Sequence, residues 1–146
     1  ATPVPTPVHA KDELYVVVGS LSGKAGSTVT IPVTFTGLNE NGLRNCDFRL
    51  QYDESALEVV SVDAGIITTL PIVNFVGYAG RAGYITFLFN DATQGSMPIK
   101  DDGVFANITF KLKKDVSEGS GVIKVTGDKA FSDSKGNKLK TSIIVE

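Results

Sequence analysis

Two short polar residues, Asn45 and Asp47, are the clearest candidates for recognition chemistry in this sequence. They alternate with the apolar residues Cys46, Phe48 and Leu50. Successive side chains of a β-strand point to opposite faces, so Asn45 and Asp47 share the outward face, about 7 Å apart. Short side chains lose little rotamer entropy when they are fixed. The pattern therefore predicts a preorganised hydrogen-bonding surface, with an ordinary solvated strand face as the alternative.

Nucleophilic catalysis by the single cysteine is not expected. Cys46 falls on the apolar side of its strand, where a free thiol usually acts as a small buried hydrophobe. A catalytic thiol needs a base nearby, and the only histidine, His9, lies far away in the sequence. A single cysteine also excludes an internal disulfide, and zinc-ligand spacing is absent.

The carboxylates do not suggest an enzyme either. They fall mostly in turns, as at Asp53–Glu54 and Asp101–Asp102, where such side chains usually cap or solvate the backbone. The sequence has no glycine-rich phosphate loop, histidine cluster or nucleophile elbow. We predict no metal site, and the open alternative is a calcium site made by Asp128, Asp133 and the Asp101–Asp102 pair without EF-hand spacing.

The elements that must position these residues are short strands separated by Gly, Asn and Asp turns. No segment has a convincing helical period, and about nine strands predict an all-β sandwich with two layers over one core. Pro32 cannot donate to a ladder and predicts an edge strand or a bulge. The predicted strands are 14–18, 28–36, 43–52, 57–62, 73–78, 84–91, 104–113, 122–126 and 142–145, with a further segment at 127–133.

One predicted strand carries an apolar residue on its polar face. Ile85, Phe87 and Phe89 share the inward parity, so Leu88 points outward. A single exposed leucine is normal in a soluble protein. It becomes informative if it lies on the same face as Asn45.

The composition indicates one globular domain. The chain has 146 residues and a formal charge of −2, so it lacks the basic footprint of a nucleic-acid-binding protein. No apolar run approaches the roughly 18 residues of a membrane-spanning helix. Residues 1–12, with Pro3, Pro5 and Pro7, predict a Thr/Pro-rich linker ahead of a domain at 13–146, as in a multi-domain extracellular protein.

A carbohydrate-binding module is the main rival among β-sandwiches. Such modules often present a planar aromatic platform, but this chain has no tryptophan. Its tyrosines, Tyr15, Tyr52, Tyr78 and Tyr84, do not form an outward stripe on one strand. A structural spacer or an adhesin-like sandwich is a third possibility.

Several short segments together resemble a type I cohesin domain, the receptor module of cellulosomal scaffoldins. The resemblance runs from about Leu14 to Val145, and its strength lies in the order and spacing of its segments. It implies a nine-stranded β-sandwich with jelly-roll topology that is not an enzyme. The segments are 26–33, 45–48 with 52–53, 57–62, 85–89, 100–106 and 130–133.

The resemblance also implies a binding site for a dockerin on the sheet made by the third, fifth, sixth and eighth strands. Asn45 and Asp47 match the central hydrogen-bonding pair of the family, and Leu88 matches its exposed leucine. Three further partner-binding positions follow from the same match: Asp91 after the sixth strand, Tyr78 on the fifth strand and Gly95 in the following loop.

The expected partner is a calcium-loaded type I dockerin on an enzyme or on another scaffoldin. Ca²⁺ is expected in the dockerin, and no cofactor is expected in this chain. We further expect an extracellular module of a cellulosome that degrades plant polysaccharides. The chain should be a monomer in isolation, without nucleic-acid binding or membrane insertion.

Overall fold

The computed structural model describes residues 13–38, 40–80, 83–93 and 96–146, without the side chains of Gly127 and Asp128. Within these residues the chain forms nine strands and one helical turn. His9, Gly95 and the 1–12 linker lie outside the described residues. The strands are β1 (Glu13–Val18), β2 (Thr28–Thr36), β3 (Asn45–Tyr52), β4 (Leu57–Ala64), β5 (Phe75–Ala79), β6 (Tyr84–Asn90), β7 (Gly103–Leu112), β8 (Ile123–Ser132) and β9 (Lys140–Val145), and the helical turn is α1 (Pro71–Asn74).

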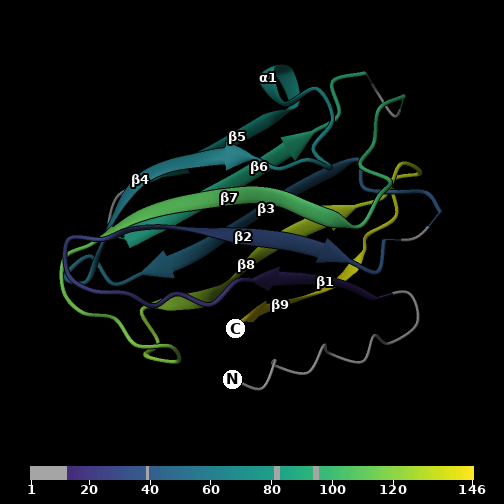
Figure 1. Ribbon diagram of the computed structural model, residues 1–146. Coiled ribbons are helices and arrows are strands. Elements are labelled where there is room, and N and C mark those ends of the chain that lie inside the picture. Colours follow the sequence, from purple (N-terminus) through teal and green to yellow (C-terminus); the bar gives the residue numbers. More distant parts are fainter. Residues whose placement is uncertain (1–12, 39, 81–82, 94–95) are drawn as a thin grey trace.

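The strands form two sheets that pack face to face (Figure 1). One sheet has five strands in the order β4-β7-β2-β1-β9, and the other has four in the order β5-β6-β3-β8. From β2 to β9 the chain alternates between the sheets, except where β5 and β6 are neighbours. This is the predicted jelly-roll sandwich. The four-stranded sheet contains the four strands expected to bind a partner.

Phenylalanines from both sheets fill the space between the layers. Phe35 of β2 stacks on Phe105 of β7 with ring centroids 4.4 Å apart, and both belong to the five-stranded sheet. Phe48 of β3 stacks on Phe87 of β6 at 4.8 Å and on Phe131 of β8 at 5.4 Å. All five rings are essentially inaccessible to solvent. Because Phe48 lies next to Asp47, this packing fixes the strand that carries the predicted polar pair.

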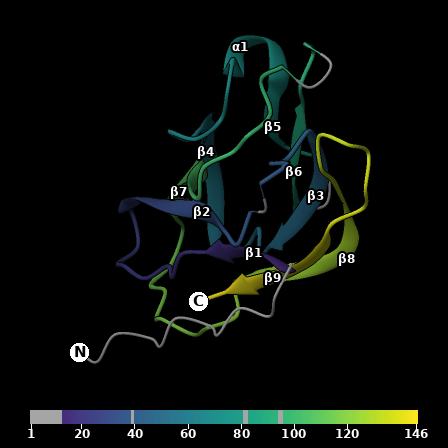
Figure 2. The same ribbon diagram turned by 90° about the vertical axis from the view of Figure 1, so that its right-hand side faces the viewer.

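The edges of the two sheets meet on both sides of the sandwich, with β4 over β5 and β8 over β9. Gly77 of β5 permits the close approach on the first side. A Cβ at this position would lie 2.5 Å from Val62 Cγ1 of β4. Figure 2 shows the layers from one end, with α1 beside β5 and far from β9.

One local prediction was wrong, and another was confirmed in one of its two alternatives. The fifth strand begins at Phe75 rather than at residue 73, because Pro71 at the start of a helical turn commits residues 71–74 to α1. Pro32 predicted an edge strand or a bulge, and the structure has the bulge: β2 is an interior strand whose register shifts between Val33 and Thr34. Pro32 is tolerated there because it lies just past the last residue of β2 that pairs with β1.

Candidate functional site

The outward face of the four-stranded sheet brings together residues from all four strands. Asp47 of β3 lies opposite Leu88 of β6 on one side and opposite Ala130 of β8 on the other. Leu88 in turn pairs with Val76 of β5. Side chains directly opposed in antiparallel strands have Cβ atoms about 4.5–5.5 Å apart. Val76, Leu88, Asp47 and Ala130 therefore form one row across the sheet, which we call the central row.

A polar row lies beside the central row. Asn45 pairs with Asn90 of β6 and with Ser132 of β8. Asn45 is half-buried and Asp47 is exposed, so both have access to the surface. The structure thus places Asn45, Asp47 and Leu88 on one face, as the parity of their strands predicted.

Tyr78 lies on the same face, one strand further out. It pairs with Thr86 of β6, and 49% of it is exposed. Val76, two residues earlier on β5, is also 49% exposed. The β5 side of the face is therefore apolar and aromatic, whereas β3 supplies the polar groups.

Asp91 does not lie on the exposed surface. It is 2% exposed, and its carboxylate accepts hydrogen bonds from the backbone N–H groups of Thr93 and Met97, at 2.9 Å each, and from the Thr93 hydroxyl. The carboxylate of Asp91 thus organises its own loop, a role that the family resemblance did not predict. The loop is also held at both ends, because Asp91 N–H donates to Arg44 O and Ile99 pairs with Leu43.

Arg49 and Val76 are the main face residues that sequence reasoning did not select. Arg49 shares the outward parity of Asp47 and is exposed. It separates two shallow hollows of the face. One is lined by Asp47, Lys129 and Ala130, and the other by Tyr78, Gly80, Tyr84 and Thr86.

Strand parity was enough to find Arg49 on the outward face. Val76 was harder to recognise because its strand is short. Gly77 beside it also weakens the alternation that would have placed it.

Three of the residues considered for catalysis or metal binding, Cys46, Asp102 and Asp133, have structural roles, and the side chain of Asp128 lies outside the described part of the structure. Cys46 is buried, and burial raises the pKa of its thiol. Asp102 accepts hydrogen bonds from Gly37 N–H at 3.1 Å and Leu38 N–H at 3.0 Å. Asp133 likewise accepts hydrogen bonds from Asn137 N–H at 2.8 Å and Lys135 N–H at 3.0 Å. In the described part of the chain, no group of three or more His, Cys, Asp or Glu side chains could hold a metal ion.

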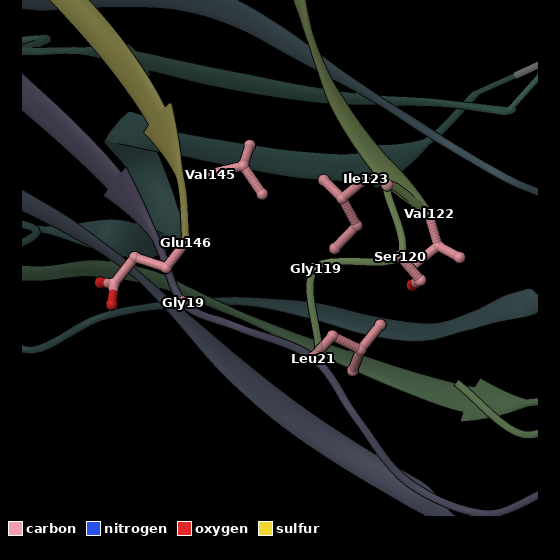
Figure 3. Close-up of a pocket in the computed structure, with 9 residues that line it drawn as sticks. Gly19, Leu21, Gly119, Ser120, Val122, Ile123, Val145 and Glu146 are labelled. Atoms are coloured by element: carbon pink, nitrogen blue, oxygen red, sulfur yellow. The ribbon is translucent and has the colours of Figure 1, made fainter. Parts of the chain in front are cut away.

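A separate hollow lies at the end of the sandwich where β9 ends and β8 begins (Figure 3). Leu21, Ile123 and Val145 point into it, and glycines supply much of the remaining wall. Among the described residues that line the hollow, Glu146 is the only titratable one, and these residues offer no convergent polar groups for a specific ligand.

Comparisons with known proteins identify the family. The family model described as "Cohesin domain" matches residues 14–146. The chain is 41% identical over 116 residues to cellulose-binding protein A of Clostridium cellulovorans, covering 80% of this chain and 6% of that protein. It is 36% identical over 132 residues to cellulosomal-scaffolding protein B of Acetivibrio thermocellus, covering 87% and 17%. The chain thus spans only a small part of these relatives.

Solved structures of cohesins have the same fold. The sixth cohesin of scaffoldin B from Acetivibrio cellulolyticus, solved in complex with a mutant Cel5 dockerin, superposes with a TM-score of 0.83 at 34% identity. That match covers 91% of this chain and 97% of the other. A type I cohesin–dockerin complex from Clostridium thermocellum, Coh-OlpC with Doc435, gives 0.80 at 33% identity, covering 97% and 94%.

No helix in the described residues is long and apolar enough to cross a membrane.

The family match covers nearly the whole described chain, and the two-sheet fold agrees with it. On these grounds the chain belongs to the cohesin domain family.

Proposed function

We propose that this chain is a non-catalytic module that binds a type I dockerin through the outward face of its four-stranded sheet. The observation that carries the proposal is the central row, in which Leu88 and Asp47 lie side by side next to Asn45. Similar cohesins were solved in complex with dockerins, which supports the same class of partner here.

The face combines an apolar anchor with short hydrogen-bonding groups. In the proposed complex, Leu88 and Val76 are covered by apolar side chains of the dockerin. Asn45 and Asp47 bond polar groups of its helices, and the surrounding contacts exclude water. The stacked phenylalanines beneath β3 hold this face in place, which lowers the entropy cost of binding on this side.

The partner-binding set then needs one adjustment. Tyr78 keeps its place on the face, whereas Asp91 supports the face by shaping the loop after β6. Gly95 belongs to the same loop by sequence and remains a proposed contact.

Calcium belongs to the dockerin in this proposal. Ca²⁺ prefers clusters of oxygen ligands, and Asp102 and Asp133 are already engaged by backbone donors in this chain. Calcium would order the loops of the partner and thereby create the helical surface that docks.

The proposed biological setting is an extracellular scaffoldin that assembles a cellulosome. The relatives are named as cellulosomal scaffolding proteins, and this chain spans one small part of such a protein. Dockerins on enzymes or on another scaffoldin would be gathered near one polysaccharide substrate, where linker reach sets their effective concentration. The isolated domain would be a monomer.

Isothermal titration calorimetry with a panel of calcium-loaded type I dockerins tests the proposal. The panel includes the Cel5 dockerin of Acetivibrio cellulolyticus and Doc435 of Clostridium thermocellum. We expect one-to-one binding to at least one member. A pull-down on insoluble cellulose serves as the counter-test. Retention on cellulose combined with no binding across the panel would instead favour a carbohydrate-binding module.

A further inference from the structure

An unusual set of exposed aliphatic side chains surrounds α1. Ile72 is 99% exposed, Ile66 is 91% exposed and Val73 is 68% exposed, and Leu70 at the start of the helical turn is also exposed. Isolated surface aliphatics need no explanation, but a concentrated set on one short segment marks an interaction site. We call Ile66, Leu70, Ile72 and Val73 the apolar shelf.

The segments around the shelf contain no charged residues. From Ala64 to Gly80 there is no charged residue, and the same is true from Ala92 to Ile99. A solvated surface loop normally carries charged residues, and fully buried segments lack them. The shelf therefore has the composition of a surface that another molecule covers.

The shelf is also held firmly. Asn74 Nδ2 donates to Thr69 O at 3.1 Å, and Asn74 Oδ1 accepts from Ala92 N–H at 3.1 Å. The Thr69 hydroxyl donates to Met97 O at 2.5 Å, and the Thr68 hydroxyl donates to Phe105 O at 2.7 Å. These bonds join the segment to the loop after β6 and to β7. A preorganised apolar surface loses little entropy when a partner covers it.

The shelf continues the candidate binding face. α1 leads directly into β5, and both views of the fold place it at the β5 edge of the four-stranded sheet (Figures 1 and 2). Val73 is three residues from Val76, which spans at most about 10 Å of extended chain. Val76 belongs to the central row and pairs with Leu88.

We propose that the apolar shelf is an extension of the dockerin-binding face and takes apolar side chains at the end of a dockerin helix. This inference rests on the proposed function, because it names a second contact of the same partner. The shelf would add buried apolar area and favour dockerins with aliphatic or aromatic residues at that position. Dockerins with charged residues there would be rejected, because the shelf segment offers no counter-charge.

The test compares one double and one single shelf variant with a control variant by calorimetry, against a dockerin from the panel that binds the wild-type chain. Ile72→Ser with Val73→Ser should weaken binding about tenfold and make the heat-capacity change of binding less negative, since less apolar area is buried. The matched control is Val60→Ser, which replaces an exposed aliphatic of β4 in the other sheet and should leave the dissociation constant unchanged. Ile72→Lys is the second shelf variant.

Thermal unfolding of each variant checks that a loss of affinity does not come from a loss of folding. Because Ile72 is almost fully exposed, its replacement should leave the thermal midpoint unchanged. Unchanged affinity and heat capacity in both shelf variants would overturn the inference while leaving the proposed function standing. A wild-type dimer in sedimentation equilibrium that the shelf variants dissociate, without any change in dockerin affinity, would assign the shelf to a second copy of the chain and also overturn it. Absence of binding by the wild-type chain across the panel would instead refute the proposed function.

Discussion

At the scale of single residues, the proposed binding face depends on short polar side chains beside the half-buried Leu88. Asp47 and Leu88 are direct cross-strand neighbours, and Asn45 lies one row away. A hydrogen bond formed next to an apolar contact is shielded from water once the partner is bound, so losing it leaves an unsatisfied group in the interface. The proposed face would therefore act as one unit of polar and apolar groups.

The first prediction concerns the polar pair. Asn45→Ala and Asp47→Ala should each weaken dockerin binding by about 1–3 kcal/mol, because each leaves a buried partner group without its hydrogen bond. Calorimetry gives the affinity and thermal unfolding gives the stability. The matched controls are Asn107→Ala and Asp63→Ala, a cross-strand pair on the outward face of the other sheet. An equal loss of affinity in the controls, or no loss of affinity in either test variant, would show that the interface lies elsewhere.

The second prediction concerns Leu88. Leu88→Asp should reduce binding more than either alanine variant, because it places an unpaired charge in a dry contact and next to Asp47. Its folding should be close to that of the wild type, since Leu88 is only half-buried in the free chain. Surface plasmon resonance measures the expected rise in dissociation rate. A variant that binds as tightly as wild type would exclude Leu88 from the interface.

Strand parity predicted the outward positions of Asn45, Asp47 and Leu88, because a two-residue period is visible in a sequence. The same periodicity could not predict that Asp91 is buried in its own loop. Whether a carboxylate meets a partner or its own loop depends on where the N–H groups of Thr93 and Met97 fall. That is decided by loop geometry rather than by periodicity.

At the scale of elements, loops at one end of the sandwich hold the polar end of the face. Asp133 lies in the turn between β8 and β9. Its carboxylate accepts from Asn137 N–H at 2.8 Å, from Lys135 N–H at 3.0 Å, and from the side-chain amides of Asn137 and Asn41. Because Asn41 precedes β3, Asp133 ties the β8–β9 turn to the segment that leads into Asn45.

The third prediction follows from the charge of Asp133. Burial by itself would raise the pKa of this carboxyl, but the hydrogen bonds from Asn137, Lys135 and Asn41 hold the pKa below its usual value. A carboxyl with a lowered pKa in the folded state stabilises the fold above its unfolded pKa of about 3.9. That stability is lost as the pH falls through the folded pKa.

Chemical denaturation at pH 7 and at pH 3 measures this effect. Asp133→Asn should destabilise the chain at pH 7, and the difference from wild type should shrink at pH 3. Asp63→Asn, an exposed carboxylate of β4, is the control. If the difference in unfolding free energy between variant and wild type were the same at both pH values, the ionised carboxylate would contribute nothing to stability.

The strands were predictable because apolar and polar residues alternate along them. The helical turn α1 was not, since four residues are too few to show a helical period. The position of β2 was left open, because Pro32 is compatible with an edge strand or a bulge. Only the assembled sheet reveals that β1 pairing ends at Val33 and that a bulge follows there.

At the scale of the whole molecule, the two sheets present outer surfaces that differ in chemistry. The four-stranded sheet presents the central row and its polar neighbours, and the proposed shelf lies at its β5 edge. The opposite sheet presents a polar outer face that includes the Thr30–Thr109 hydroxyl pair, 2.9 Å apart. The sandwich itself was predictable from strand number and turns, whereas the shelf became visible only once the exposure of residues 66–73 was known.

The fourth prediction concerns calcium. A chelator such as EDTA should abolish dockerin binding by unfolding the partner, and excess Ca²⁺ should restore it. The thermal midpoint of this chain alone should not change with the chelator. Differential scanning calorimetry of each protein alone shows whether the chelator acts on the dockerin or on this chain. A chelator-dependent drop in the midpoint of this chain would reveal a calcium site within it.

The most direct test of the account is chemical-shift mapping. The ¹⁵N-labelled chain is titrated with an unlabelled, calcium-loaded type I dockerin that binds it. The account predicts the largest backbone amide shifts in β3, β5 and β6 and in the adjoining part of β8, centred on Asp47 and Leu88. Shifts centred on β2 and β7 of the five-stranded sheet, with the central row unaffected, would contradict it.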